Sequence, residues 1–202
     1  MKMNRIMLLG FLFSTVLNTQ VFAQVTVGQP APDFSLPDTQ GQTRSLSDYK
    51  GKFVVLEWAN HDCPFVRKQY DSGNMQSLQK AYTEKGVVWL TIGSSAPGKQ
   101  GNFSPESWNE LTQKKGASPS AVLLDPKGEV GRLYEAQTTP HMYIINPEGN
   151  LVYQGAIDSI ASTDTDDVPK ADNYVRSALD EAMNGKSVTN SNTKSYGCSV
   201  KY

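Results

Sequence analysis

The chain has 202 residues, of which 38% are hydrophobic, with 19 basic and 20 acidic side chains and a formal net charge of −1. Its charges are mixed along the sequence rather than clustered, which argues against nucleic acid or an anionic membrane as a partner. The length fits one domain with a substantial core, since no internal repeat or interior linker divides it.

The first residues have the pattern of a targeting signal. Lys2 and Arg5 precede an apolar stretch, residues 6–16, that is too short to span a bilayer comfortably. Residues 21–23 carry the small or aliphatic side chains that a signal peptidase reads. We therefore expect a signal peptide over residues 1–23, with cleavage after Ala23. We also expect an exported protein, periplasmic if the source is Gram-negative, without stable insertion in a membrane.

The predicted elements begin with a small hairpin. Residues 31–36 form a short extended piece that contains proline, a turn follows, and residues 43–46 return. Residues 52–56 are an apolar run of the length of a fully buried strand.

Strands and helices then alternate along the rest of the chain. A helix is predicted from Pro64, with an interruption at residues 71–74 and an end at Gly86. Further strands are predicted at 87–92, 121–125, 142–145 and 151–153, and further helices after Ser104, over 128–136 and over 173–183. This order predicts an α/β fold with a central mixed β-sheet flanked by helices and an N-terminal hairpin extension. We place the domain at 24–185 and a polar tail at 186–202.

Cys63 lies where the first buried strand ends and a helix begins. Pro64 suits the first position of a helix, because its missing N–H costs nothing there. Free backbone N–H groups and the positive end of the helix dipole stabilise a thiolate at such a position, so its pKa can fall well below about 8.5. A small buried apolar residue is the alternative reading of a free cysteine. The coincidence of strand end, proline and helix start favours a reactive thiol.

Three charged neighbours of Cys63 have open roles. Glu57 lies in the predicted central strand, where it either is buried with a raised pKa and relays protons or points to solvent. Asp62 is placed to cap the helix that starts at Pro64. Arg67, one turn after the cysteine, either stabilises a thiolate or peroxide oxygen or belongs to a solvated helix face.

Three separated motifs resemble those of one family. Residues 27–36 and 46–52 resemble the opening of redoxins, the thioredoxin-fold proteins of the peroxiredoxin and thiol-specific antioxidant group. Trp58-Ala59, followed by Cys63-Pro64, resembles the active-site approach of thioredoxin-like proteins. Thr138-Thr139-Pro140 resembles their loop with a cis proline. The resemblance covers nearly all of residues 25–185 and implies a thioredoxin-like fold and a peroxiredoxin-like exported protein.

Two positions depart from the family patterns. Val66 stands where thioredoxins carry their second cysteine, so a local disulfide cannot form. Asn60 and Leu56 stand where peroxiredoxins carry threonine and proline before the peroxide-reacting cysteine. The oxidant, a peroxide or a protein disulfide, therefore stays open at this point.

The chemistry implied is that of a thiol-dependent oxidoreductase without a cofactor. A sulfenic acid or mixed disulfide on Cys63 must be resolved by a second thiol, and Cys198 in the tail is the only internal candidate. A mobile tail of this length can reach back to Cys63 or to a second subunit. A structural disulfide clip, or a tail thiol with no role, is the alternative for Cys198. The thiol reductant and the oligomeric state are not predicted.

The resemblance also brings side chains near the sulfur. Thr139 and Pro140 would supply backbone groups that align an extended partner or frame Cys63. If the fold holds, both histidines of the chain, His61 and His141, lie near Cys63 and tune its pKa or move protons near neutral pH. The sequence thus indicates a catalytic set: Cys63, Cys198, His61, Arg67, Thr139, Pro140.

Two alternative functions remain. His61, Cys63 and His141 are nitrogen and sulfur ligands that suit copper or zinc, as in a metal-binding thioredoxin-fold chaperone. A non-catalytic binding protein on a redoxin scaffold is the other, because fold does not fix function.

Overall fold

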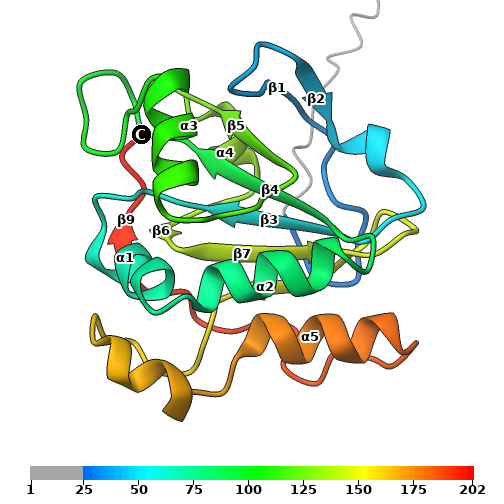
Figure 1. Cartoon of the computed structure of the whole chain (residues 1–202). Helices are drawn as coiled ribbons and strands as arrows, with labels where there is room; N and C mark the ends of the chain where they lie inside the picture. The colour runs from blue at the N-terminus through cyan, green and yellow to red at the C-terminus, as the bar shows by residue number, and fades with distance from the viewer. Residues whose placement is uncertain (1–24) are drawn as a thin grey trace, which may run out of the picture.

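A five-stranded mixed sheet forms the centre of the computed structural model, which describes residues 25–202 (Figure 1). Its strands, in spatial order, are β5 (Ala121–Leu124), β4 (Val88–Gly93), β3 (Val54–Trp58), β7 (His141–Ile145) and β8 (Leu151–Gly155). β3, β4 and β5 are parallel, while β7 and β8 are antiparallel to their neighbours. The predicted mixed sheet is confirmed. The predicted signal peptide and its cleavage site lie outside the described residues.

The N-terminal hairpin extension is also confirmed. β1 (Ser35–Pro37) pairs antiparallel with β2 (Thr43–Ser45), and the 3-10 helix η1 (Leu46–Tyr49) follows. Phe34 and Leu36 are buried against one face of the sheet, so the hairpin covers part of that face.

Within residues 25–202, five α-helices accompany the sheet: α1 (Pro64–Asp71), α2 (Asn74–Thr83), α3 (Pro105–Lys114), α4 (Glu129–Leu133) and α5 (Tyr174–Met183). The predicted interruption of the first helix is real. Gly73 has a φ of 76°, a left-handed conformation that glycine adopts without steric cost, and it separates α1 from α2. Ser104 and Asn173 cap α3 and α5 by accepting backbone N–H groups. The 3-10 helix η2 (Thr165–Lys170) was not predicted.

The sheet has a hydrophobic core on each face. Successive side chains of β3 point to opposite faces, so they enter the two cores in turn. Val55 faces the core that α1, α2 and α5 share. Leu56 and Trp58 face the other core, with the hairpin and α4. Glu57 follows the alternation of Val55 and therefore enters the first core, where it is fully buried.

The C-terminal residues differ from the prediction of a free tail. Residues 186–202, which we call the C-terminal strap, follow a defined path against the domain, drawn in orange to red in Figure 1. Within the strap, β9 (Cys198–Ser199) pairs antiparallel with β6 (Thr138–Thr139), directly before Pro140. Each of these strands has two residues, too few to produce a sequence pattern, and their contact joins distant parts of the chain.

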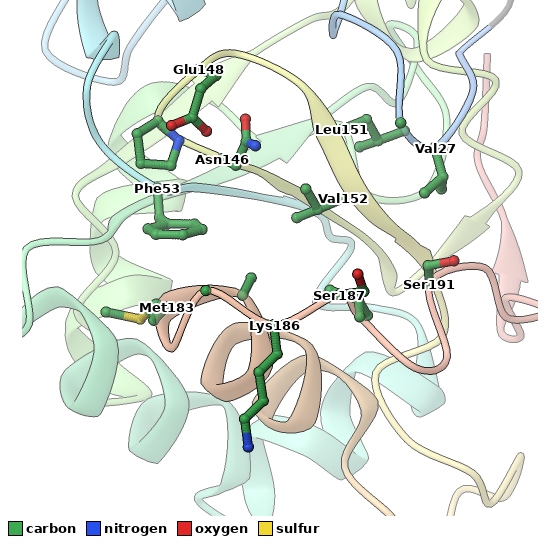
Figure 2. Close-up of a pocket in the computed structure, with 15 residues that line it drawn as sticks. Val27, Phe53, Asn146, Glu148, Leu151, Val152, Met183, Lys186, Ser187 and Ser191 are labelled. Atoms are coloured by element: carbon green, nitrogen blue, oxygen red, sulfur yellow. The ribbon is translucent and has the colours of Figure 1, made fainter.

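A cavity of about 640 Å³ lies beside the residue that precedes β3 and the end of α5 (Figure 2). Phe53, Glu148, Met183 and Ser187 are among the residues that line it. Phe53 directly precedes β3, whereas Cys63 follows the end of that strand, so this cavity does not serve the thiol. Among residues 25–202, no helix is both long and apolar enough to cross a lipid bilayer.

Candidate active site

Cys63 is the N-cap residue of α1 and is fully buried. Its Sγ donates a hydrogen bond to the Thr139 carbonyl oxygen at 3.1 Å. The backbone N–H of Cys198 donates to the same sulfur at 3.4 Å. The strand end, the helix start and the strap therefore meet at one sulfur atom.

The pKa of Cys63 is lowered from its ordinary value. Burial raises this pKa, but hydrogen bonds from the Cys198 thiol and from the backbone N–H groups of Val66 and Cys198 outweigh burial. The position at the start of α1 acts in the same direction through the helix dipole. Cys63 is thus the sulfur that ionises first.

Cys198 has the opposite tendency. Both cysteines are free thiols, and Cys198 is half-buried. Burial, its hydrogen bond to Cys63 and repulsion from the Cys63 charge raise the pKa of Cys198 to about 11. In this pair, Cys63 therefore forms the thiolate. Cys198 keeps its proton and donates a hydrogen bond to the Cys63 sulfur.

The loop around Pro140 frames this pair. The Thr139–Pro140 peptide bond is cis, as the resemblance implied. Thr139 lies opposite Cys198 in the β6–β9 register, so its backbone contacts both cysteines. Thr139 and Pro140 thus lie where the sequence placed them, and the strap occupies the strand edge beside them.

Arg67 and Asp62 do not contact the Cys63 sulfur through hydrogen bonds within the described chain. Arg67 is exposed, and its charge acts on Cys198, whose pKa it lowers. The predicted cap by Asp62 is wrong, because Cys63 itself is the N-cap and Asp62 is exposed. The backbone N–H of Asp62 instead donates to the Asn60 side chain in the preceding turn.

The two histidines do not converge on the sulfur. The ring of His61 packs edge-on against Tyr70 and Trp108, with centroid separations of 4.7 and 5.2 Å. His141 pairs with Trp58 across the β3–β7 ladder, and its ring packs 4.6 Å from that of Tyr143, in the core on the other face of the sheet.

The state of the histidines also differs from the prediction. Burial lowers the pKa of each to about 4, with a smaller contribution from Lys115 at His61. Both imidazoles are therefore neutral at pH 7, and neither exchanges protons near neutral pH. Over residues 25–202, no group of three or more His, Cys, Asp or Glu side chains is arranged to hold a metal ion. The alternative ligand set of His61, Cys63 and His141 is not brought together.

Glu57 lies in a network of donors beneath the site. Its carboxylate accepts hydrogen bonds at 2.7–3.2 Å from four side chains that come from three elements: Tyr70, Gln79, Trp89 and Thr91. Burial raises the pKa of Glu57, although these four hydrogen bonds lower it. The solvent-facing alternative for Glu57 is wrong. The donors were not foreseen, because they come from α1, α2 and β4, and only the fold brings these segments together around Glu57.

Replacing Glu57 by leucine should destabilise the fold by roughly 3–5 kcal/mol. The substitution leaves the buried donors of Tyr70, Trp89 and Thr91 without the Glu57 acceptor, which costs more than a lost hydrogen bond. Denaturant unfolding measures this loss. Thr91→Val, which removes one donor only, is the control and should cost about 1 kcal/mol. An unchanged midpoint for Glu57→Leu would contradict the structural role of the network.

A reactive thiol at the start of a helix, after the central strand of a mixed sheet and against a cis-proline loop, defines a thioredoxin-fold thiol oxidoreductase. A sequence profile of the AhpC/TSA family matches residues 27–154. The chain belongs to this family and is a thiol-based oxidoreductase.

Individual relatives agree with this class. The chain is 32% identical over 154 residues to a chloroplastic peroxiredoxin Q of Populus jackii, covering 65% of this chain and 70% of the relative. It is also 32% identical to the thiol-disulfide oxidoreductase ResA of Bacillus subtilis, covering 68% and 73%. An uncharacterised conserved protein of Geobacillus kaustophilus superposes with a TM-score of 0.75 at 27% identity, over 89% of this chain and 93% of that one. The relatives include both reaction types, so they do not select between a peroxide and a disulfide.

Proposed function

We propose that the protein is an exported thiol oxidoreductase in which Cys63 attacks the oxidant and Cys198 resolves the product. The observation that carries this proposal is the seating of Cys198 at the Cys63 sulfur, with its backbone N–H 3.4 Å from Sγ. The opposite pKa shifts of the two thiols support the same division of roles.

With a hydroperoxide, the Cys63 thiolate attacks the distal oxygen and breaks the O–O bond. The sulfur becomes a sulfenic acid, and the alcohol or water leaves after taking a proton. Cys198 then attacks the sulfenic sulfur, a disulfide forms and water leaves. The two thiols have lost two electrons, and the peroxide has gained them.

With a disulfide as oxidant, the Cys63 thiolate forms a mixed disulfide and displaces one thiolate of the substrate. Cys198 then attacks Cys63, and the second thiolate leaves. Both routes end at the same Cys63–Cys198 disulfide.

An external thiol must then restore the reduced pair. We infer that it attacks the sulfur of Cys198, because Cys63 is fully buried and Cys198 is half-buried. Cys63 has the lower pKa and is therefore the better leaving group. A second equivalent of the external thiol releases Cys198 and completes the reduction.

Peptide mapping under non-reducing conditions, before and after addition of hydrogen peroxide, tests the pairing. We expect a Cys63–Cys198 linked peptide to form and both free thiols to disappear within the same molecule. Cys198→Ser is the control and should stop at a sulfenic acid on Cys63. If both thiols stay free with peroxide and with a small disulfide, or if Cys198 reacts alone, the proposal fails.

A further inference from the structure

The C-terminal strap lies over Cys63 and bears on which oxidants can reach this thiol. The inference drawn from it rests on the proposed function. At two points, a glycine allows the strap to pack closely against the domain. A Cβ atom on Gly155 would overlap the Thr193 carbonyl, and one on Gly197 would overlap the Thr139 carbonyl. The strap therefore lies closer to the domain backbone at these points than any other residue would allow.

The strap ends in an aromatic anchor. The Tyr202 ring lies over α4, where a Cβ atom on Gly131 would approach its Oη to 2.5 Å. Arg132 lies over the same ring, with its guanidinium carbon 4.5 Å from the ring centre. The Tyr202 hydroxyl donates to the Ala136 carbonyl at 2.7 Å. These contacts fix the strap four residues after Cys198.

A second anchor holds the strap two residues before Cys198. Tyr196 donates to the buried Asp158 carboxylate at 2.5 Å and packs edge-on against Phe65 of α1. Asp158 also accepts from Gln69 and lies 3.6 Å from the fully buried Lys68 ammonium. Cys198 is thus held between two anchored tyrosines rather than at the end of a loose chain.

Between these anchors, the strap closes the strand edge next to the thiol. β9 pairs with β6, and the Val200 N–H donates to the Gln137 carbonyl at 3.0 Å. An extended polypeptide that approached Cys63 along β6 would need these same backbone groups. A peroxide needs no strand edge, because it has only a few atoms and no backbone to pair.

We propose that the anchored strap is a specificity element, which restricts the oxidant of Cys63 to small molecules by occupying the β6 edge that an extended protein substrate would use. Protein disulfides reach the thiol only when the strap lifts. Peroxide reaches it through small local openings that leave both anchors in place.

The test compares two reactions of Cys63 in a Cys198→Ser background, where Cys63 is the only thiol. Oxidation by hydrogen peroxide is followed as sulfenic acid trapped by dimedone. Attack on a short unstructured peptide, whose cysteine carries a thionitrobenzoate disulfide, is followed by release of the yellow thionitrobenzoate. In this second reaction Cys63 forms a disulfide with the peptide cysteine, and thionitrobenzoate leaves as the thiolate.

Two variants disrupt the Tyr202 anchor. Tyr202→Ala removes the ring from the strap, and Gly131→Ala places a methyl group on α4 where the ring lies. Each should raise the ratio of the peptide rate constant to the peroxide rate constant by about tenfold or more, because lifting the strap becomes easier. Tyr202→Phe keeps the ring over α4 and should restore most of the low ratio. Tyr49→Ala, which truncates a partly buried tyrosine in η1, is the matched control and should leave the ratio unchanged.

The ratio does not depend on whether Cys198 resolves the cycle, so this test and that of the proposed function fail separately. An unchanged ratio in both anchor variants, with both variants folded by circular dichroism, would overturn the role of the strap. An equal rise of both rate constants would show a general barrier and would overturn the selectivity. Peptide reactivity without peroxide reactivity in the Cys198→Ser protein would also overturn it, while the disulfide route of the proposed function would stand.

Discussion

Replacing Cys63 by serine should abolish the reaction with peroxide and with disulfides, a loss of about three orders of magnitude or more in rate constant. The hydroxyl of serine does not ionise near neutral pH, so the hydrogen bonds that lower the Cys63 pKa have no thiolate to stabilise. The fold should survive, because the two side chains are similar in size. Stopped-flow consumption of peroxide and trapping of the sulfenic acid both measure the loss.

Cys198→Ser is the matched control for this result. It keeps the attacking thiol, so the first oxidation should remain within several-fold of wild type, while turnover with a thiol reductant should fall. A Cys63→Ser protein that still consumes peroxide, with Cys198 as the oxidised residue, would reverse the proposed roles.

Lowering the pH from 7 to 4 should destabilise the protein by about 3 kcal/mol for each histidine. The folded-state pKa of His61 and of His141 is about 4, below the ordinary value of 6.5. The unfolded chain therefore binds protons first as the pH falls. The stability from the neutral imidazoles is fully present above pH 6.5 and is lost as the pH falls toward 4. The raised pKa of Glu57 acts in the opposite direction, whereas the lowered pKa of Asp38 acts in the same direction as the histidines.

Urea unfolding at pH 7, 5.5 and 4 measures this dependence. The chain has two histidines, so the variant His61→Phe/His141→Gln removes every imidazole that titrates in this range. Its free energy of unfolding should change less between pH 7 and 4 than that of wild type, even though its stability at pH 7 is lower. Parallel curves for the two proteins would show that neither histidine is buried in its neutral form.

Local patterns and the family resemblance together predicted the parts of the fold that position Cys63. The apolar run before the cysteine and Pro64 after it depend on neighbouring residues, whereas the cis bond before Pro140 was implied by the resemblance, and each appears in the structure as expected. The strap could not be predicted in this way. Its residues are polar, its strand has two residues, and its partners in β6 are about 60 positions away.

The histidines show a second limit of sequence reasoning. His61 is two residues from Cys63, and His141 follows the proline beside it, yet proximity in sequence does not fix the direction of a side chain. Tyr70 and Trp108 provide an aromatic site for His61, and strand alternation turns His141 toward Tyr143. Hydrophobic packing, rather than the chemistry of the thiol, decided both orientations.

The proposed disulfide between Cys63 and Cys198 would link the redox state of the protein to its resistance to unfolding. Cys63 and Cys198 are 135 positions apart, so a bond between them would close a loop that contains most of the described chain. Closing a loop of this size restricts the unfolded ensemble and favours the native state by about 5 kcal/mol. Each catalytic cycle would then alternate between a molecule that resists unfolding and proteolysis and one that yields more easily. The reduced form, which waits for its oxidant, is the vulnerable one.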